Sequence, residues 1–505
     1  MNRTWFLAGA VALGVLSPAM AAQDTVIRLT TKTSEPIATL DPRFLSFTLD
    51  VKYLESGEGT FVHDLGSPRL RALTHALAPA YLRFGGTLAD QVYFAARDGE
   101  TLPKGLVVKL TPEAYDALFD FTSNSGLDLF FDLSAGPGNR GPDRAWLSNN
   151  AVALMTYAHQ SQHWPAIWEL GNEASSFWLN YGFSGQISPR RYALDYAEAR
   201  RSLRSIDPLA RLAGPASSYN PIVGELLAPI FGEMEGFLRH SPRDSVDVVT
   251  WHYYATQGIA NWIQYREASL QNLLDPVVLN EVRHWAVQIR SLHDKFQPKS
   301  ALWMGETGPA QSGGTPGVTD RFASSFWWLD ELGTLATAGH SVVVRQTLCG
   351  KGYPLIDRPD FDPRPDYWAS LLWKRLMGDR VLAVGNPHEG KRLRAYAHCT
   401  PQGGEIRPGS VTVLLLNLNL TEPIRVGLAD FPGRALREYL VEATDLGSAD
   451  VKLNGGVLRA GDAGELPELR YVSRTTVAKK TPVLEIPPRA YAFVVIEDAG
   501  APACM

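Results

Sequence analysis

Two glutamates combine residue type and surroundings in a way that could perform chemistry together. Glu173 ends the segment WELGNE (168–173), and Glu306 lies in the segment WMGETGPAQSGGTP (303–316). Hydrolysis of a glycosidic bond with retention of configuration needs two carboxyl groups of this kind. One protonates the leaving oxygen and later deprotonates water, and the other attacks the anomeric carbon from the opposite face. We predict Glu173 as the acid/base and Glu306 as the nucleophile.

Neighbouring residues bear on this prediction. A single glutamate at a strand end is more often a helix cap or an ion-pair partner, so the prediction depends on the pair. Asn172 is placed to hydrogen-bond the 2-hydroxyl of a sugar, a contact that strengthens in the transition state. Arg345 is a candidate to keep Glu306 ionised by charge pairing.

Other chemistries fit the sequence poorly. It contains no G-x-S-x-G, H-E-x-x-H or Walker motif. His163 and His252 could pair with carboxylates, but lone histidines in such a protein are more often satisfied core residues, and neither is assigned a role.

The elements that must position these residues alternate between strand and helix. Ser188 and Pro189 are a typical N-cap and first helical residue, and Gly339 closes a later helix. Eight strand–helix units predict a (β/α)8 barrel of the α/β class. An open doubly wound sheet is the alternative, but no G-x-G-x-x-G follows the first strand. The predicted strands are 44–50, 80–86, 127–134, 166–173, 210–216, 246–254, 301–307 and 341–348.

Such a barrel would bring the two glutamates together. Active residues gather at the carboxyl ends of barrel strands. Glu173 ends the fourth predicted strand and Glu306 the seventh. Strands three apart end across the mouth of a barrel, so we expect the two carboxyl groups to lie about 5–6 Å apart.

The sequence pattern changes after Gly378. Short strand-like runs separated by Gly, Pro and Asp, without helical periodicity, predict a β-sandwich over 379–505. The segment 23–43, which includes the strand-like run 25–33, precedes the barrel at 44–378. We expect that run to add a strand to the sandwich and so to join the two ends of the chain.

The first 21 residues read as an export signal. Arg3 gives a positive start, residues 5–16 are apolar, and Ala19-Met20-Ala21 is a small-x-small cleavage site. The apolar run is too short to span a membrane stably. We expect a mature chain that begins at Ala22 and resides in the periplasm or outside the cell; an uncleaved anchor is the alternative.

Composition limits the remaining options. The 505 residues, 45% hydrophobic and 20% charged, suffice for a large barrel and an accessory domain. A net charge of −5 provides no overall basic field, so no nucleic-acid partner is expected. Three cysteines suit one disulfide and one spare thiol, without C-x-x-C spacing for zinc. We predict no cofactor, no metal, a carbohydrate partner and a monomer.

At these motifs the chain resembles the heparanase-type enzymes of glycoside hydrolase family 79. WELGNE resembles the acid/base motif of the family, and WMGETGPAQSGGTP resembles its nucleophile motif. The segments 65–87, 247–254, 342–346 and 361–378 are similar to family segments as well. The resemblance implies a barrel with a β-sandwich, retention of configuration, and glucuronic acid in the −1 subsite.

The resemblance also implies roles for single residues. Asp50 and Thr87 match positions at which the family lines its cleft. Tyr353 and the turn around Ser312 match positions at which the family binds the sugar carboxylate. Consecutive backbone amides in such a turn can bind a carboxylate without a buried cation. Cys399 and Cys504 match the disulfide of the family's sandwich. The predicted substrate-binding residues are Asp50, Thr87, Asn172, Tyr254, Ser312, Gly313, Gln346 and Tyr353.

Three departures from the animal members concern substrate choice. Residues 94–109 form a short loop, so no cleavage into two subunits is expected. Residues 214–227 contain no Lys or Arg where the animal members carry basic clusters, which makes tight binding of highly sulfated chains doubtful. The stretch 257–276 is longer than its animal counterpart and could close one end of the cleft, which would favour an exo enzyme.

These observations give one leading hypothesis and two alternatives. The leading hypothesis is a secreted retaining β-glucuronidase that acts on heparan sulfate, heparosan-like or related chains. An exo-acting glycosidase of the same clan on a neutral sugar is the first alternative, and a carbohydrate-binding protein without turnover is the second.

Overall fold

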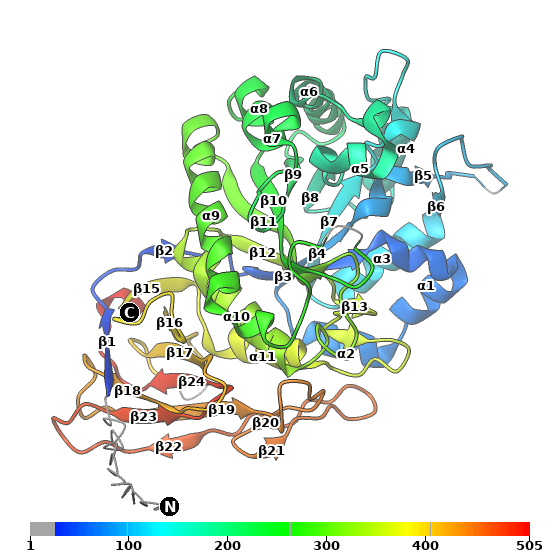
Figure 1. Cartoon of the computed structure of the whole chain (residues 1–505). Helices are drawn as coiled ribbons and strands as arrows, with labels where there is room; N and C mark the ends of the chain where they lie inside the picture. Colours follow the sequence, from blue (N-terminus) through cyan, green and yellow to red (C-terminus); the bar gives the residue numbers. More distant parts are fainter. Residues whose placement is uncertain (1–25, 98, 262–263, 404–405) are drawn as a thin grey trace, which may run out of the picture.

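The computed structural model describes residues 26–97, 99–261, 264–403 and 406–505. The predicted export signal at 1–21 lies outside these residues. Within them the chain forms a closed barrel surrounded by helices and, below it in Figure 1, a second large sheet.

The predicted (β/α)8 barrel is confirmed. Eight parallel strands close in the order β10-β11-β12-β3-β4-β7-β8-β9. β8 and β11 are three strands apart in this ring, as the prediction requires for residues that face each other. The strands are β3 (Leu45–Asp50), β4 (Ala80–Gly85), β7 (Leu127–Leu133), β8 (Ile167–Leu170), β9 (Leu212–Tyr219), β10 (Val248–Gln257), β11 (Ala301–Gln311) and β12 (Val342–Arg345).

Helices cover the outside of the barrel, and α6 begins at the cap that the sequence predicts. Ser188 Oγ accepts from the amide of Arg191 at 3.2 Å at the start of α6. Asp275 caps α9 in the same way, accepting from the amide of Val277 at 2.9 Å. The helices are α1 (Glu58–Leu65), α2 (Pro68–His75), α3 (Pro112–Asn124), α4 (Asn149–Gln160), α5 (Phe177–Tyr181), α6 (Pro189–Ile206), α7 (Ala228–Phe231), α8 (Glu233–His240), α9 (Pro276–Phe296), α10 (Phe322–Thr337) and α11 (Pro365–Leu376).

The barrel interior is filled in layers by side chains that alternate along each strand. Near the amino ends of the strands, the ring of Trp303 lies 4.8 Å from that of Tyr81 and 6.0 Å from that of Phe130. Arg83, two residues after Tyr81 on β4, lies above this aromatic layer, with its guanidinium 5.7 Å from the Phe130 ring. The apolar floor therefore supports a polar layer nearer the carboxyl ends.

Two small parallel pairs flank the barrel. β5 (Val92–Phe94) pairs with β6 (Val108–Leu110) and brackets the loop at 94–109. β13 (Cys349–Gly350) pairs with β14 (Ile356–Asp357) just after β12.

The C-terminal strands form a mixed sheet that includes β1 (Ile27–Lys32) from the other end of the chain. β1 pairs in parallel with β18 and antiparallel with β15, so it lies inside the sheet rather than at its edge (Figure 1). β2 (Ala38–Thr39) also pairs with β15. The other strands are β15 (Arg380–Gly385), β16 (Leu393–Cys399), β17 (Val411–Asn417), β18 (Ile424–Leu428), β19 (Leu436–Glu442), β20 (Lys452–Leu453), β21 (Gly456–Val457), β22 (Val472–Arg474), β23 (Val483–Ile486) and β24 (Ala490–Ile496).

This sheet folds into two layers with a core of its own, which the alternation of residues explains. Val413 and Leu415 of β17 pack with Leu29, Val426 and Leu484 from the other layer. A disulfide joins Cys399 at the end of β16 to Cys504, with a Cα–Cα distance of 5.2 Å. This is the pairing that the family resemblance implies, and Cys349 is a buried free thiol.

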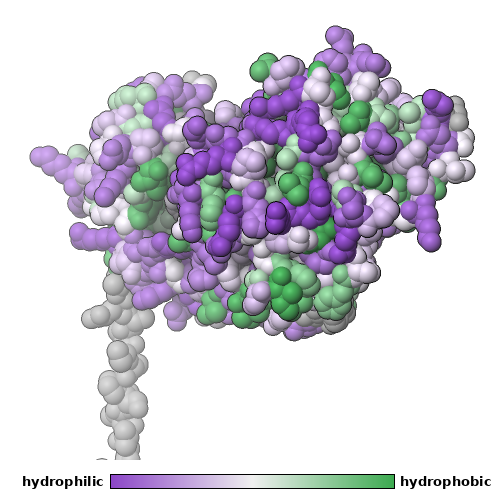
Figure 2. Space-filling view, turned by 90° about the horizontal axis from the view of Figure 1, so that it is seen from above, coloured by the Kyte–Doolittle hydropathy of each residue, from purple (hydrophilic) through white to green (hydrophobic). Residues whose placement is uncertain are grey.

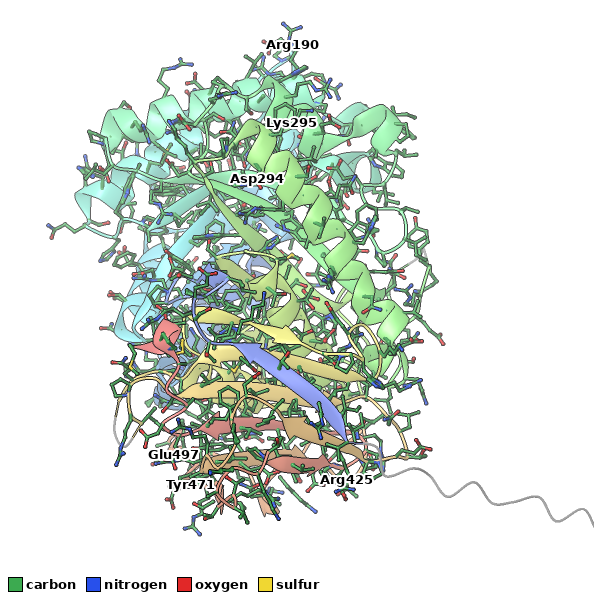
Figure 3. The ribbon with its side chains drawn as sticks, turned by 90° about the vertical axis from the view of Figure 1, so that its left-hand side faces the viewer. Arg190, Asp294, Lys295, Arg425, Tyr471 and Glu497 are labelled. Atoms are coloured by element: carbon green, nitrogen blue, oxygen red, sulfur yellow. A yellow bond between two sulfur atoms is a disulfide. The ribbon has the colours of Figure 1, made fainter. Side chains whose placement is uncertain are left out.

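The opposite face of the sheet packs against barrel helices. Tyr491 of β24 lies against Phe322 of α10, with ring centroids 5.7 Å apart, and the Tyr396 hydroxyl donates to Asp330 of α10 at 2.6 Å. Figure 3 shows the outer side of the sheet, with Arg425, Tyr471 and Glu497, at the opposite end of the molecule from Arg190, Asp294 and Lys295. The barrel and the sheet thus share a continuous apolar interface.

The surface seen from above is mainly hydrophilic, with small separate hydrophobic patches (Figure 2). Among the residues that the structure describes, no helix is both long and apolar enough to cross a membrane.

Candidate active site

Glu173 lies in a turn just beyond β8. The predicted strand was to end at this residue, but β8 stops at Leu170, and Gly171 begins the turn with φ 76°. Glu173 itself has φ 54° and ψ 49°, a conformation that is uncommon outside glycine and often marks functional sites. Its amide donates to the carbonyl of Ala216 on β9 at 3.1 Å, which fixes the turn against the neighbouring strand.

Glu306 lies inside β11, which continues to Gln311, rather than at the end of a strand as predicted. Simple alternation would point Glu306 to the same side as Met304, which packs outside the barrel. The register of β11 with β12 shifts between Met304 and Thr307. Such a bulge re-aims a side chain, and Glu306 consequently points into the barrel.

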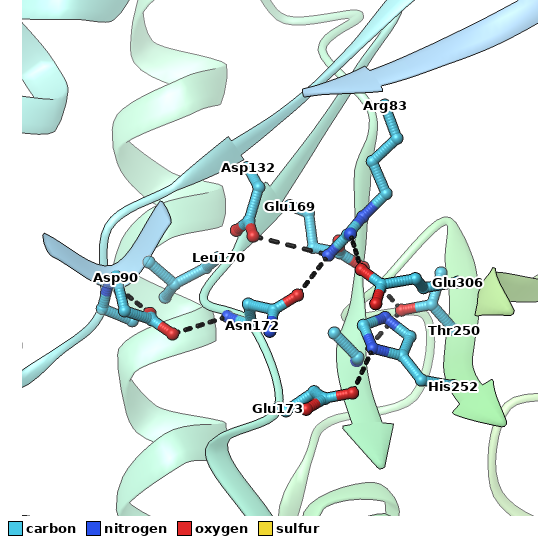
Figure 4. Close-up of polar contacts among 12 residues, drawn as sticks. Arg83, Asp90, Asp132, Glu169, Leu170, Asn172, Glu173, Thr250, His252 and Glu306 are labelled. Atoms are coloured by element: carbon cyan, nitrogen blue, oxygen red, sulfur yellow. Dashed lines mark hydrogen bonds and ion pairs between the residues drawn. The ribbon is translucent and has the colours of Figure 1, made fainter. Parts of the chain in front are cut away.

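The two carboxyl groups and a histidine form one cluster at the mouth of the barrel (Figure 4). A carboxylate oxygen of Glu173, one of Glu306 and a ring nitrogen of His252 all lie within 4.8 Å of one another. All three residues are buried. The structure therefore brings the two predicted glutamates together.

Arg83 is the cation of this site. It is fully buried, and its Nη1 donates to Glu306 Oε2 at 2.8 Å. The same guanidinium donates to Glu169 Oε2 at 2.8 Å, to Asn172 Oδ1 at 3.0 Å and to Asp132 Oδ2 at 3.4 Å (Figure 4). The planar fork of an arginine suits several acceptors in fixed directions, so Arg83 holds the nucleophile candidate in place.

The prediction that Arg345 pairs with Glu306 is wrong. Val342 and Val344 point into the barrel, so alternation along β12 turns Arg345 outward. There it pairs with Asp366 of α11 and lies 5.4 Å from the ring of Trp327. The same rule would have found Arg83, which follows the inward Tyr81 by two residues.

Buried acidic residues other than Glu306 also lie near Arg83. Burial raises the pKa of Asp132 well above its ordinary value, and it raises the pKa of Asp90 to about 7. Asp90 accepts from the amides of Ala135 and Asn172, each at 3.1 Å. The guanidinium of Arg83 lies closer to Glu169 and Glu306, at 2.8 Å each, than to Asp132 at 3.4 Å.

The two glutamates differ in their surroundings. Burial raises the pKa of Glu173 to about 7, opposed by the charge of Arg83 and a hydrogen bond from Ser218. Glu306 receives hydrogen bonds from Arg83 and, at 2.5 Å, from the Tyr254 hydroxyl. Donors of this kind favour the ionised form of a carboxyl group. Glu173 is therefore suited to hold a proton near neutral pH, whereas Glu306 is surrounded by hydrogen-bond donors.

His252 also belongs to the site, although a lone histidine in such a barrel was not expected to have a role. Its Nδ1 lies 3.1 Å from Glu173 Oε1. Burial lowers the pKa of His252 to about 4, so the ring is neutral near pH 7. Alternation along β10 places Thr250, His252 and Tyr254 on one face of the strand, and that signal was available in the sequence.

The predicted substrate-binding residues near β3 and β12 lie together. Gln346 Nε2 donates to Asp50 Oδ2 at 2.6 Å. Burial raises the pKa of Asp50 to about 6, partly offset by the amide of Lys52. Thr87 is exposed just beyond β4, at the start of a short 3-10 helix (Thr87–Gln91).

The predicted carboxylate-binding turn follows β11. Ser312 and Gly313 are exposed and have φ 60° and 80°. The loop of Tyr353 packs directly on this turn, because a Cβ added at Gly352 would lie 2.0 Å from the Gly313 carbonyl oxygen. Burial and the nearby charges of Glu306 and Asp50 raise the pKa of Tyr353. Tyr353 is thus close to the glutamate cluster, as the prediction requires.

The atoms of Glu173, His252 and Glu306 are of the types that bind metal ions. Arg83, however, already donates to Glu306, and its positive charge disfavours a second cation at that carboxylate. The arrangement suits proton transfer and nucleophilic attack better than metal binding.

Comparisons with known proteins agree with the geometry. Residues 29–333 match the model of the glycosyl hydrolase family 79 N-terminal domain. The chain is 33% identical to heparanase of Mus musculus, covering 99% of this chain and 98% of that protein. It is 27% identical to hyaluronoglucuronidase of Hirudo nipponia (95% and 99%) and 29% identical to inactive heparanase-2 of Homo sapiens (95% and 90%).

Solved structures share the fold at lower identity. A 4-O-α-L-rhamnosyl-β-D-glucuronidase from Fusarium oxysporum 12S superposes with a TM-score of 0.67 at 14% identity, covering 93% of this chain and 100% of that one. A family 51 arabinofuranosidase from Xanthomonas axonopodis pv. citri gives 0.66 at 15% identity, covering 94% and 100%.

Proposed function

Because the chain belongs to glycosyl hydrolase family 79, we propose that it is a retaining β-glucuronidase that cleaves glucuronic-acid-containing poly- or oligosaccharides. The observation that carries the proposal is the pair of carboxyl groups, whose nearest oxygens lie within 4.8 Å. Retaining enzymes hold the two groups about 5–5.5 Å apart, whereas inverting enzymes separate them by about 6.5–9.5 Å.

In the proposed mechanism a Glu306 oxygen attacks the anomeric carbon as the bond to the leaving oxygen breaks. Glu173 gives its proton to that oxygen, and a glycosyl ester on Glu306 remains. Water then attacks the same carbon, Glu173 takes a proton from it, and Glu306 leaves as a carboxylate. Arg83 and Tyr254 stabilise the departing carboxylate through the hydrogen bonds they donate.

The choice of glucuronic acid is supported by residues close to the pair. Tyr353 and the Ser312–Gly313 turn offer donors where the family resemblance expects the sugar carboxylate. A neutral sugar would offer no carboxylate to the buried Tyr353 hydroxyl, and a buried donor left unpaired costs about 1–3 kcal/mol. The names of two similar proteins, a hyaluronoglucuronidase and a rhamnosyl-glucuronidase, are consistent with this choice.

The extent of sulfation and the mode of cleavage are part of the proposal. Residues 214–227 carry no Lys or Arg, so sulfate groups gain little attraction there. We expect unsulfated chains to be cleaved at least as fast as heparan sulfate, with weak salt dependence. The loop after β10 packs on the end of β11, with the amide of Gly258 donating to the Gln311 carbonyl at 2.8 Å, which favours exo cleavage.

The proposal is tested with 4-nitrophenyl β-D-glucuronide, β-D-xyloside and β-D-glucoside. We expect the glucuronide to be preferred at least tenfold in kcat/KM, and the β-anomer to be the first product in proton NMR. A first product of α configuration would contradict retention. Preference for a neutral glycoside would favour the alternative, a neutral-sugar glycosidase of the same fold, to which the arabinofuranosidase likeness is relevant.

We also propose export of the mature chain. The disulfide between Cys399 and Cys504 supports an oxidising compartment. Amino-terminal sequencing of the protein recovered outside the cytoplasm is expected to begin at Ala22, and recovery of an intact Met1 would contradict cleavage.

A further inference from the structure

An aromatic surface begins directly after Glu173. Phe183 is 67% exposed, and its ring is stacked on that of Trp178, with centroids 5.7 Å apart and planes 22° from parallel. Phe231, from the segment after β9, lies 6.3 Å from Phe183. Exposed faces of large aromatic rings are uncommon without a function and frequently mark binding surfaces.

Hydrogen bonds fix this surface to the turn that holds Glu173. Gln186 accepts from the amide of Trp178 at 2.9 Å and donates to the carbonyl of Ala174, the residue after Glu173, at 3.0 Å. Ser175 Oγ accepts from the amide of Ser218 on β9 at 3.1 Å. Gln186 therefore connects the backbone of Trp178 to the turn of the proposed acid.

The chemistry of the surface differs from that of the catalytic cluster. Residues 174–187 include no Asp, Glu, Lys or Arg. The adjoining segment after β9 adds Ile222 and Ile230, which are 60% and 68% exposed. Its acidic residues Glu225 and Glu233 are buried. The exposed Arg144, which donates to the Ser184 carbonyl, is a charged group at the edge of this surface. The aromatic rings themselves suit the C–H face of a sugar ring, which could stack on them.

The position relative to Glu173 indicates which sugar this would be. Glu173 protonates the leaving oxygen in the proposed mechanism, so the sugar that departs lies on the side of Glu173 and of the segment that follows it. We propose that Trp178, Phe183 and Phe231 form a subsite for the leaving-group side of the carbohydrate chain, on which the C–H face of a pyranose ring stacks. This inference rests on the proposed function and extends it to the acceptor side.

The test compares two substrates that share the glucuronic acid and differ in the leaving group. One is β-D-glucuronosyl fluoride, whose leaving group does not reach the aromatic surface. The other is a tetrasaccharide of alternating glucuronic acid and N-acetylglucosamine with glucuronic acid at its non-reducing end. Phe183→Ala is expected to lower the ratio of kcat/KM on the tetrasaccharide to that on the fluoride at least fivefold, mainly through KM. Phe183→Trp should restore the ratio.

The control is Leu209→Ala, which removes a side chain that is 86% exposed just before the amino end of β9. It should leave the ratio as in the wild type. An unchanged ratio in Phe183→Ala overturns the subsite. If that variant instead loses binding to lipid vesicles, the surface is a membrane contact, and if it loses a dimer that the wild type forms, the surface contacts a second copy of the chain. A wild type inactive on the fluoride would instead contradict the glucuronidase proposal. In that case the affinity for the tetrasaccharide is measured by calorimetry in the wild type and in Phe183→Ala. Equal affinity of the two proteins would separately contradict the subsite.

Discussion

The two proposed catalytic glutamates, considered residue by residue, differ in what their neighbours favour. Glu306 receives donors from Arg83 and Tyr254, whereas Glu173 faces a neutral His252 in a buried position. Replacement of Glu306 by Gln should reduce turnover at least 10³-fold on every glycoside, because no nucleophile remains. Glu173→Ala should slow substrates with sugar leaving groups far more than 4-nitrophenyl or fluoride leaving groups. Rates on this substrate series measure the difference, and equal losses on all of them would contradict the acid/base role.

The pH dependence should report Glu173. Its pKa is raised to about 7, so its proton is present below that pH and is lost as the pH rises through 7. We expect kcat/KM on a substrate with a sugar leaving group to fall tenfold for each unit above about pH 7. The fluoride, which needs no proton, should lack this limb. A basic limb that survives in Glu173→Ala would assign it to another group.

Arg83 should matter through position as well as charge. A lysine at this place keeps the charge but cannot donate to Glu306, Glu169 and Asn172 at once. We expect Arg83→Lys to lower kcat about 10²-fold with a smaller change in KM, because the nucleophile is no longer held in line. Inactivation by a 2-fluoro-glucuronosyl reagent should slow in parallel. Arg394→Lys is the matched control, since Arg394 is also buried and paired with an aspartate, Asp330, but lies at the interface with the C-terminal sheet.

The secondary-structure elements were more predictable than their ends. All eight barrel strands fall on the runs that the sequence indicates, because β-branched and aromatic residues alternate there with amphipathic helices. The extension of β11 to Gln311 and its bulge near Glu306 were not predictable, since a bulge depends on the register with β10 and β12. Alternation alone predicts that Arg83 and His252 point into the barrel, and it also turns Arg345 outward, because Val342 and Val344 point inward.

The contact between the Tyr353 loop and the Ser312–Gly313 turn offers a test at the level of elements. Gly352→Ala would place a Cβ 2.0 Å from the Gly313 carbonyl oxygen and so displace the turn. We expect KM for glucuronides to rise at least fivefold, with a smaller effect on neutral glycosides. Gly317→Ala is matched in backbone conformation, with φ 80° against 91°, but has no atom within 4 Å of the added Cβ. An equal effect of both variants would assign the loss to backbone strain rather than to the turn.

At the scale of the whole molecule, the disulfide should contribute to stability rather than to catalysis. It closes a loop of 105 residues that spans most of the C-terminal sheet. Cys504→Ser should lower the free energy of unfolding by about 2–5 kcal/mol, measured by denaturant titration, with kcat unchanged before unfolding. Cys349→Ser removes a buried thiol that closes no loop, so this variant keeps the disulfide and should retain the wild-type dependence on reducing agent, whereas Cys504→Ser should lose it. Equal sensitivity of the wild type to denaturant with and without reductant would contradict this.

The position of β1 at the start of the chain determines the order in which the barrel and the C-terminal sheet can form. It is synthesised first, yet β15, with which it pairs, follows roughly 350 residues later. At translation rates of about 5–20 residues per second, that strand waits roughly 20–70 s for its partners. The barrel can close during this interval, whereas the C-terminal sheet cannot, because a strand from its middle is held at the far end of the nascent chain. The C-terminal sheet is therefore completed only when β1 pairs with β15 and β18 from the other end of the chain. A fragment made only of residues 379–505 would lack the strand that joins its two layers.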